Sequence, residues 1–178
     1  EVDDGYNNQA QTILDQLPDH LNWDRLILSP TVKDQIEDMY EELLLAIETG
    51  DPLRWLMVVE GPPGIGKTLL AQTLAIELSQ HVEPEKLAWI VIKGTEPVST
   101  FLGQSEANIR GIWSTVRENS EKGIVTIVLW DEIEATFPQR GTQSNMWPST
   151  ITNTFLSEID GLNPVNNVVF IATTNRAD

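Results

Sequence analysis

Apolar and polar positions along the chain follow two patterns: short continuous apolar runs, and longer stretches with apolar residues at helical spacing. The apolar runs predict buried strands at 55–60, 87–92, 124–130 and 168–173. The helical spacing predicts helices at 30–50, 67–80, 109–123 and 151–161. Because strands that alternate with helices form βαβ units, the pattern predicts an α/β fold with a parallel sheet.

The boundaries of these elements are marked by turn-forming residues. Ser29 and Pro30 predict the start of the first long helix, and Gly50 predicts its end. Loops are expected at 94–103 and 135–149. Residues 1–22 are polar and acidic, with weak periodicity, and are expected to form a linker or a short helix.

Composition narrows the class of protein. The 178 residues suit one domain with a sizeable core, and 40% hydrophobic with 21% charged residues is an ordinary globular balance. The net charge of -16, without a run of Lys or Arg, argues against a nucleic-acid partner. The absence of Cys excludes disulfides and thiolate metal sites. No apolar stretch reaches the length of a membrane span and no signal peptide opens the chain, so a cytoplasmic location is expected.

The turn between the first strand and the helix that follows carries the most specific motif. It fits the pattern G-x-x-x-x-G-K-[ST], and reads Gly61-Pro62-Pro63-Gly64-Ile65-Gly66-Lys67-Thr68. Glycines let backbone N–H groups turn toward a phosphate, and the helix N-terminus adds its positive dipole end. Lys67 is expected to reach the β- and γ-phosphates, and Thr68 to offer its hydroxyl to Mg²⁺. The segment from Gly61 to Leu69 is therefore predicted to bind ATP.

Two carboxylates follow the third predicted strand. Asp131 and Glu132 come directly after the apolar run 127–130. In open α/β sheets ligands bind beyond the carboxyl ends of the strands, where these acids would stand. Asp131 is expected to help hold Mg²⁺, and Glu132 to polarise the attacking water. Taken alone, the pair could also be solvated acids that cap a strand.

These segments resemble the AAA+ ATPases, and within them the AAA subgroup of protein unfoldases and remodelling enzymes. The resemblance covers roughly residues 22–178, and it begins with Asn22-Trp23-Asp24, which is similar to the family's entry segment. Within the subgroup the resemblance is closest to the bacterial proteasome-associated ATPases and the Cdc48-like ATPases, and it does not single out either. It implies that residues 23–178 are the large nucleotide-binding subdomain, with Ile27 beside the adenine. Ile27 and its neighbours also suit a role in the core.

Two further segments carry the resemblance. Residues 99–110 look like the family's first pore loop and its following helix, which implies that Phe101, Leu102 and Gly103 grip a polypeptide substrate. A buried aromatic that anchors a loop is the alternative. The segment 172–176 is similar to the sensor 1 strand, which implies that Asn175 contacts the γ-phosphate or the attacking water. Residues 142–148 lack the paired arginines of many relatives, and Trp147 within them fits either a second pore loop or the surface.

The resemblance implies a P-loop three-layer αβα sandwich with a mostly parallel sheet, working as a homo-oligomeric, hexameric ring. It also implies that the sequence stops after sensor 1, without the fifth strand, the arginine fingers and the helical lid, so that the first strand becomes a sheet edge. These 178 residues alone are then expected to hydrolyse ATP slowly at best. The expected function is ATP-driven remodelling, unfolding or translocation of proteins. Alternatives are a nucleotide-gated assembly or regulatory module and, less favoured by the acidic charge, a nucleic-acid motor or loader.

Overall fold

The computed structural model of the chain describes residues 26–93, 102–135, 157–158 and 165–175, and only the backbone at 84 and 102–106. The predictions for residues 1–22, for Phe101, for the loop with Trp147 and for most of the helix at 151–161 lie outside this part. The described elements are α2 (Pro30–Thr49), β1 (Arg54–Glu60), α3 (Lys67–His81), the short 3-10 helix η2 (Pro84–Lys86), β2 (Leu87–Lys93), α4 (Leu102–Glu121), β3 (Val125–Asp131), the 3-10 helix η3 (Ile133–Ala135) and β4 (Val168–Thr174).

The element boundaries follow the turn-forming residues, with one exception. Helix α2 begins after Ser29 with Pro30 in its first turn and ends at Gly50, whose φ of 73° is left-handed. The predicted loop at 94–103 is wrong at its end, because α4 already begins at Leu102. A single glycine costs a helix only about 1 kcal/mol, so Gly103 does not prevent this start. Leu102 and Gly103 therefore belong to the first turn of α4.

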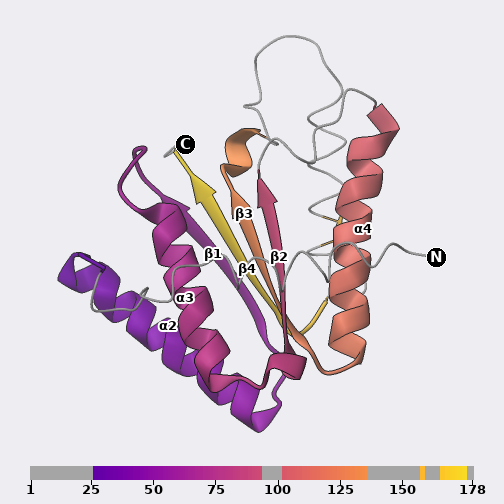
Figure 1. The fold of residues 1–178 in the computed structure, drawn as a ribbon, viewed down its shortest axis with the longest axis horizontal. Helices are drawn as coiled ribbons and strands as arrows, with labels where there is room; N and C mark the ends of the chain where they lie inside the picture. Colours follow the sequence, from indigo (N-terminus) through magenta and orange to yellow (C-terminus); the bar gives the residue numbers. More distant parts are fainter. Residues whose placement is uncertain (1–25, 94–101, 136–156, 159–164, 176–178) are drawn as a thin grey trace.

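The four strands form one parallel sheet, as the alternation of strands and helices predicts. The strand order is β1-β4-β3-β2, and the register pairs Leu56 with Phe170 and Trp130 with Ala172. Because all four strands run the same way, their carboxyl ends meet at one margin of the sheet (Figure 1). The turn after β1, the helix η3 after β3 and the end of β4 lie together there.

Helices cover the sheet on both faces, and each face has its own apolar cluster (Figure 1). Alternate strand residues point to opposite faces, so Ile127 and Ile171 join the cluster of α2 and α3, whereas Val128 and Phe170 join that of α4. On the α4 face Trp113 stacks on Phe170, with ring centroids 6.1 Å apart. The predicted three-layer α/β architecture is confirmed.

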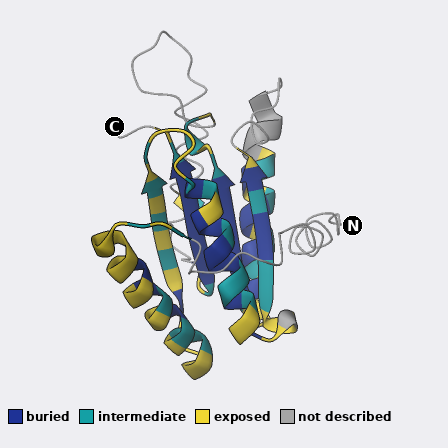
Figure 2. Cartoon of the chain, turned by 60° about the vertical axis from the view of Figure 1, so that its left-hand side comes forward, coloured by how far each residue is buried: buried dark blue, intermediate teal, exposed yellow. Residues whose placement is uncertain are grey.

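The expectation that every strand is buried is wrong for β1. Leu56 and Val58 are 57% and 59% exposed, whereas the alternate residues of β1 pack against the α2 and α3 cluster (Figure 2). The cause is position: β1 lies at the edge of the described sheet, and the cluster under α4 includes residues of β2, β3 and β4 but none of the described β1 residues. The predicted edge position of β1 is therefore confirmed.

An exposed apolar edge strand invites pairing with another chain. A protein made of these 178 residues alone should therefore associate through β1 and elute from size-exclusion chromatography above its monomer size. Replacing Leu56 and Val58 by lysine should shift it toward the monomer, because charged residues on an edge strand oppose pairing. Leu45→Lys is the matched control, since Leu45 is 60% exposed but lies on α2. A monomeric unsubstituted chain, or an equal shift with Leu45→Lys, would contradict this expectation.

Candidate active site

The turn between β1 and α3 is built around glycines in left-handed conformations. Gly64 has a φ of 82° and Gly66 a φ of 91°, a region that other residues enter only with strain. The turn is joined to the neighbouring strand, because the Gly61 N–H donates to the Thr174 carbonyl oxygen at 3.2 Å. The glycines thus bend the backbone at the carboxyl margin of the sheet. That the turn binds a phosphate stays a prediction.

Helix α3 starts directly at the end of this turn. Its N-cap is Gly66, which has no side chain to accept a hydrogen bond from the first N–H groups of the helix. The first N–H groups of a helix have no acceptor within the helix, and the macrodipole places partial positive charge beside them. Such an end, reached through a glycine turn, is suited to bind phosphate.

Lys67 lies in the first turn of α3 and is only 9% exposed. Its ammonium donates to the carbonyl oxygens of Gly61 and Pro62 at 2.8 and 3.0 Å. A third hydrogen bond, of 2.8 Å, goes to Oδ1 of Asn175 at the end of β4. The cation is therefore held between the glycine turn and the sheet, where a buried charge has the partners it needs.

Asp131 is the last residue of β3, and its carboxylate is hydrogen-bonded to Thr68, the residue after Lys67 in α3. The Thr68 hydroxyl donates to Asp131 Oδ1 at 2.9 Å. The Thr173 hydroxyl, on the adjacent strand β4, donates to the same oxygen at 2.5 Å. Asp131 is thus fixed by hydroxyl groups from α3 and β4. The Thr68 contact joins the two parts of the site: the lysine side, which is the glycine turn with Lys67, and the acidic side, which is Asp131 and Glu132.

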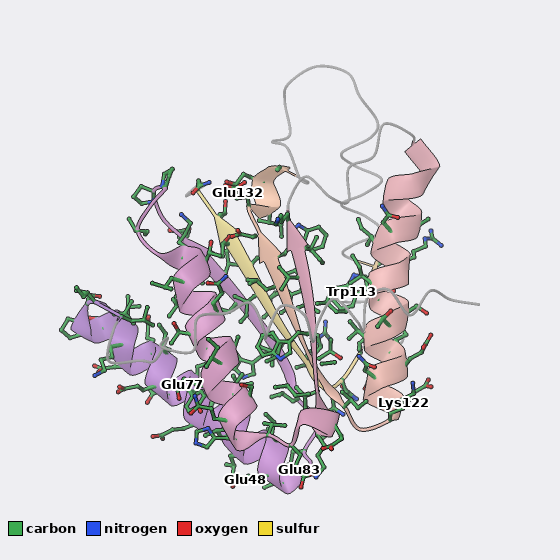
Figure 3. All side chains as sticks on the ribbon, in the orientation of Figure 1. Glu48, Glu77, Glu83, Trp113, Lys122 and Glu132 are labelled. Carbon is green, nitrogen blue, oxygen red and sulfur yellow. The ribbon has the colours of Figure 1, made fainter. Side chains whose placement is uncertain are left out.

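Glu132 lies at the tip of β3, at the margin where the strands end (Figure 3). It is exposed and has a φ of 54°, unusual for a residue other than glycine. Its N–H donates to the Thr173 hydroxyl at 3.0 Å, and its carbonyl oxygen accepts the N–H of Ala135 at 2.9 Å. The backbone of Glu132 is held on both sides, whereas no described residue hydrogen-bonds to its carboxylate.

Glu134, within η3, connects the turn after β3 to the end of β4. Its Oε1 accepts the N–H of Asn175 at 3.0 Å. Burial by itself raises the pKa of the Glu134 carboxyl, but hydrogen bonds from the N–H groups of Asn175 and Glu134 and from the side chains of Thr174 and Asn175 outweigh burial and lower it. The carboxylate form is favoured, so Glu134 can hold Asn175 at neutral pH.

The remaining predicted residues are placed as follows. The side chains of Pro62, Pro63 and Ile65 are exposed along the turn, and Leu69 is 38% exposed on α3. Ile27 is fully exposed, while its neighbours Leu26 and Leu28 pack against the α2 and α3 cluster. Phe101 lies outside the described residues. The predicted triphosphate residues Lys67, Thr68, Asp131, Glu132 and Asn175 therefore come together.

Two residues of this site were not identified from the sequence. Thr173 lies beside Asp131, because Trp130 pairs with Ala172 one position earlier in the register. The available signal was a hydroxyl residue directly after five apolar residues of a predicted buried strand. Glu134 had no such signal, since its role depends on the 3-10 turn that brings it to Asn175.

The described residues contain no group of three or more His, Cys, Asp or Glu that could hold a metal by themselves. A hydroxyl and a single carboxylate, such as Thr68 and Asp131, instead suit a cation that takes its other ligands from phosphate and water, as Mg²⁺ does. Among the helices in the described ranges, none is both long and apolar enough to cross a membrane.

Comparison with known proteins agrees with this geometry. The family described as "ATPase family associated with various cellular activities (AAA)" matches residues 57–178. A proteasome-associated ATPase of Parafrankia sp. (strain EAN1pec) is 34% identical over 157 residues, which cover 83% of this chain and 26% of that protein. A protein of Corynebacterium diphtheriae named "AAA ATPase forming ring-shaped complexes" is 36% identical over 124 residues, which cover 68% of this chain and 24% of that protein. The chain thus spans about a quarter of the length of these relatives.

Proposed function

The chain belongs to the AAA family of ATPases, and from this premise we propose that it is the nucleotide-binding part of an enzyme that hydrolyses ATP to unfold or remodel proteins. The observation that carries the proposal is the meeting of the lysine side and the acidic side of the site. Lys67 bonds to Asn175, while Thr68, the next residue, bonds to Asp131. A triphosphate placed against the glycine turn has a cation on one side and carboxylates on the other.

In the proposed reaction, water attacks the γ-phosphorus of ATP while the bond to the β,γ-bridging oxygen breaks, which gives ADP and phosphate. Glu132 accepts the proton of the attacking water, since its carboxylate stands at the strand tip without a hydrogen-bonded partner among the described residues. Lys67 exchanges carbonyl partners for phosphate oxygens and offsets their charge. Asn175, held by Glu134, orients the γ-phosphate or the water.

We also propose Mg²⁺ as the metal cofactor, held by the Thr68 hydroxyl and the Asp131 carboxylate together with phosphate oxygens. When bound, it neutralises phosphate charge as the γ-phosphoryl group is transferred. The hydrogen bond from Thr68 to Asp131 already brings these two oxygen ligands within 2.9 Å of each other. Adenine contact by Ile27 is part of the same proposal, and its exposed side chain is accessible for it.

For the whole protein we propose a cytoplasmic homo-oligomer, a hexameric ring, in which Phe101, Leu102 and Gly103 grip a polypeptide. Residues 23–178 form its large ATPase subdomain. The name of the Corynebacterium relative, which refers to ring-shaped complexes, supports the oligomer. Leu102 and Gly103 lie in the first turn of α4, which packs on the sheet, so that ATP-driven movement of the domain reaches them through this helix.

Phe101→Ala in the full-length protein should leave ATP turnover near its original rate and abolish unfolding of a tagged substrate protein. The reason is that the aromatic ring supplies apolar contact with any side chain of the substrate, whereas it takes no part in phosphate chemistry. Phe101→Tyr is the control, since it keeps the ring and should keep unfolding. Both activities are measured on the same preparation, and unfolding that survives Phe101→Ala would show that the substrate is gripped elsewhere.

A further inference from the structure

Thr173 has a buried hydroxyl in a strand whose residues from 168 to 172 are all apolar and buried. Thr173 is 1% exposed, at the point where β4 reaches the site. A buried hydroxyl is costly unless it is hydrogen-bonded. The hydrogen-bond partners of this hydroxyl therefore show whether Thr173 only fills space in the core or also holds residues of the site.

Among the described residues, the hydrogen-bond partners of the Thr173 hydroxyl are both at the tip of β3. The hydroxyl donates to Asp131 Oδ1 at 2.5 Å and accepts the Glu132 N–H at 3.0 Å. One side chain therefore touches both residues of the acidic pair, and it does so from the neighbouring strand. Asp131 has its carboxylate oriented, and Glu132 has its backbone fixed.

The contact with Glu132 is at a strained point of the chain. Glu132 has a φ of 54°, and a residue other than glycine stays in this region only where its surroundings hold it there. The Thr173 hydroxyl holds the N–H side, while the Ala135 N–H holds the carbonyl side through η3. Without the hydroxyl, Glu132 loses one of the two contacts that set the direction of its side chain.

We propose that Thr173 is a positioning residue of the ATPase site, which orients the Asp131 carboxylate toward the metal and aims Glu132 at the attacking water. This rests on the proposed ATP hydrolysis. Thr173 acts through Asp131 and Glu132 and takes no part in proton transfer itself. Hydrogen-bond partners of ligating carboxylates are worth about 10- to 100-fold in metal affinity or activity.

The chain offers a matched control on the adjacent strand. Thr126 of β3 is also fully buried, and its hydroxyl accepts a hydrogen bond from the Asn119 side-chain amide at 3.1 Å. It lies at the opposite end of the sheet from Asp131, near the start of β3. Replacing either threonine by valine removes one buried hydroxyl from the same sheet at nearly constant volume, but only Thr173 contacts the site.

The test uses the full-length protein with Thr173→Val, Thr173→Ser and Thr126→Val, and measures kcat and KM for ATP. Thr173→Val should lower kcat about 10- to 100-fold and raise KM by a smaller factor, because Lys67 and the glycine turn still bind the nucleotide. Thr173→Ser keeps the hydroxyl and should restore most of kcat. Thr126→Val should leave kcat unchanged. If Thr173→Val does not fold, Thr173→Ala removes the same hydroxyl with less bulk.

A second readout does not depend on turnover: the affinity for a fluorescent ADP with Mg²⁺ and with chelator. Thr173→Val should reduce the ratio of the affinity with Mg²⁺ to the affinity with chelator, and Thr126→Val should not. The inference is overturned by an unchanged kcat and ratio in Thr173→Val, or by an equal loss in Thr126→Val. The same assay separates the two hypotheses. Turnover lost in Glu132→Gln but kept in Thr173→Val rejects only the positioning role, whereas no ATP turnover in the unsubstituted protein rejects the proposed function itself.

Discussion

Replacing Glu132 by glutamine in the full-length protein should slow ATP hydrolysis by about 10²- to 10⁴-fold, the contribution of a positioned general base. Binding of ATP should persist, because Lys67, the glycine turn and the start of α3 are unchanged. The variant should therefore retain ATP instead of ADP after gel filtration. Single-turnover hydrolysis and analysis of the bound nucleotide measure both effects.

The size of this effect follows from the geometry at the tip of β3. The amide of glutamine has nearly the shape of the carboxylate but cannot accept the proton of water. The backbone of Glu132 is fixed by Thr173 and Ala135, so the replacement side chain keeps its direction. No described residue hydrogen-bonds to the carboxylate, so the substitution breaks no contact among the described residues.

Glu48→Gln is the matched control for this prediction, because Glu48 is exposed near the end of α2, at the opposite end of the molecule from Glu132 (Figure 3). It should hydrolyse ATP like the unsubstituted protein. Turnover that persists in Glu132→Gln would place the base elsewhere. Tight nucleotide binding without turnover in the unsubstituted protein would favour a nucleotide-gated assembly module.

Removal of the Lys67 ammonium should weaken ATP binding itself. A hydrogen bond to a charged group contributes about 1.5–3 kcal/mol, so Lys67→Ala should raise the Kd for ATP by about 10- to 100-fold, since 1.4 kcal/mol is a factor of ten. The ammonium is already held in place by Gly61, Pro62 and Asn175, and is 9% exposed. Little ordering of the side chain is then needed when phosphate arrives. Isothermal titration calorimetry measures the change.

Lys122→Ala controls for the loss of one positive charge from an acidic protein. Lys122 is exposed just after α4, near the opposite end of the sheet from the glycine turn (Figure 3). It should bind ATP with the original Kd. An unchanged Kd in Lys67→Ala, or an equal loss in Lys122→Ala, would mean that Lys67 has no specific contact with the phosphates. Thermal unfolding of both variants shows whether the fold is retained.

The arrangement of the elements could be predicted because it depends on local patterns. Apolar runs and helical spacing fix where β3, β4 and α2 lie, and glycine and proline mark their ends. Parallel strands end at one margin, so Lys67 and Asp131 were expected on the same side of the sheet. The structure has Thr68, the residue after Lys67, hydrogen-bonded to Asp131. The assignment of chemical roles to these residues stays a prediction.

What the sequence did not reveal depends on tertiary register. Thr173 meets Asp131 only because β3 and β4 pair with Trp130 opposite Ala172, and no local pattern states that register. The exposure of Leu56 and Val58 likewise depends on which strands α4 covers. Helix α4 begins as early as Leu102 because a glycine in a helix costs only about 1 kcal/mol, so that Gly103 does not prevent the helix from starting there.

Lys67 with the glycine turn, and Asp131 with Glu132, should bind one and the same triphosphate. The most direct measurement is an experimental structure of the full-length Glu132→Gln protein with ATP and Mg²⁺. We expect the β- and γ-phosphates in the glycine turn, with the Lys67 ammonium in hydrogen-bond contact and the metal beside Thr68 and Asp131. A nucleotide bound elsewhere, or phosphates that contact only one of the two sides, would contradict the account.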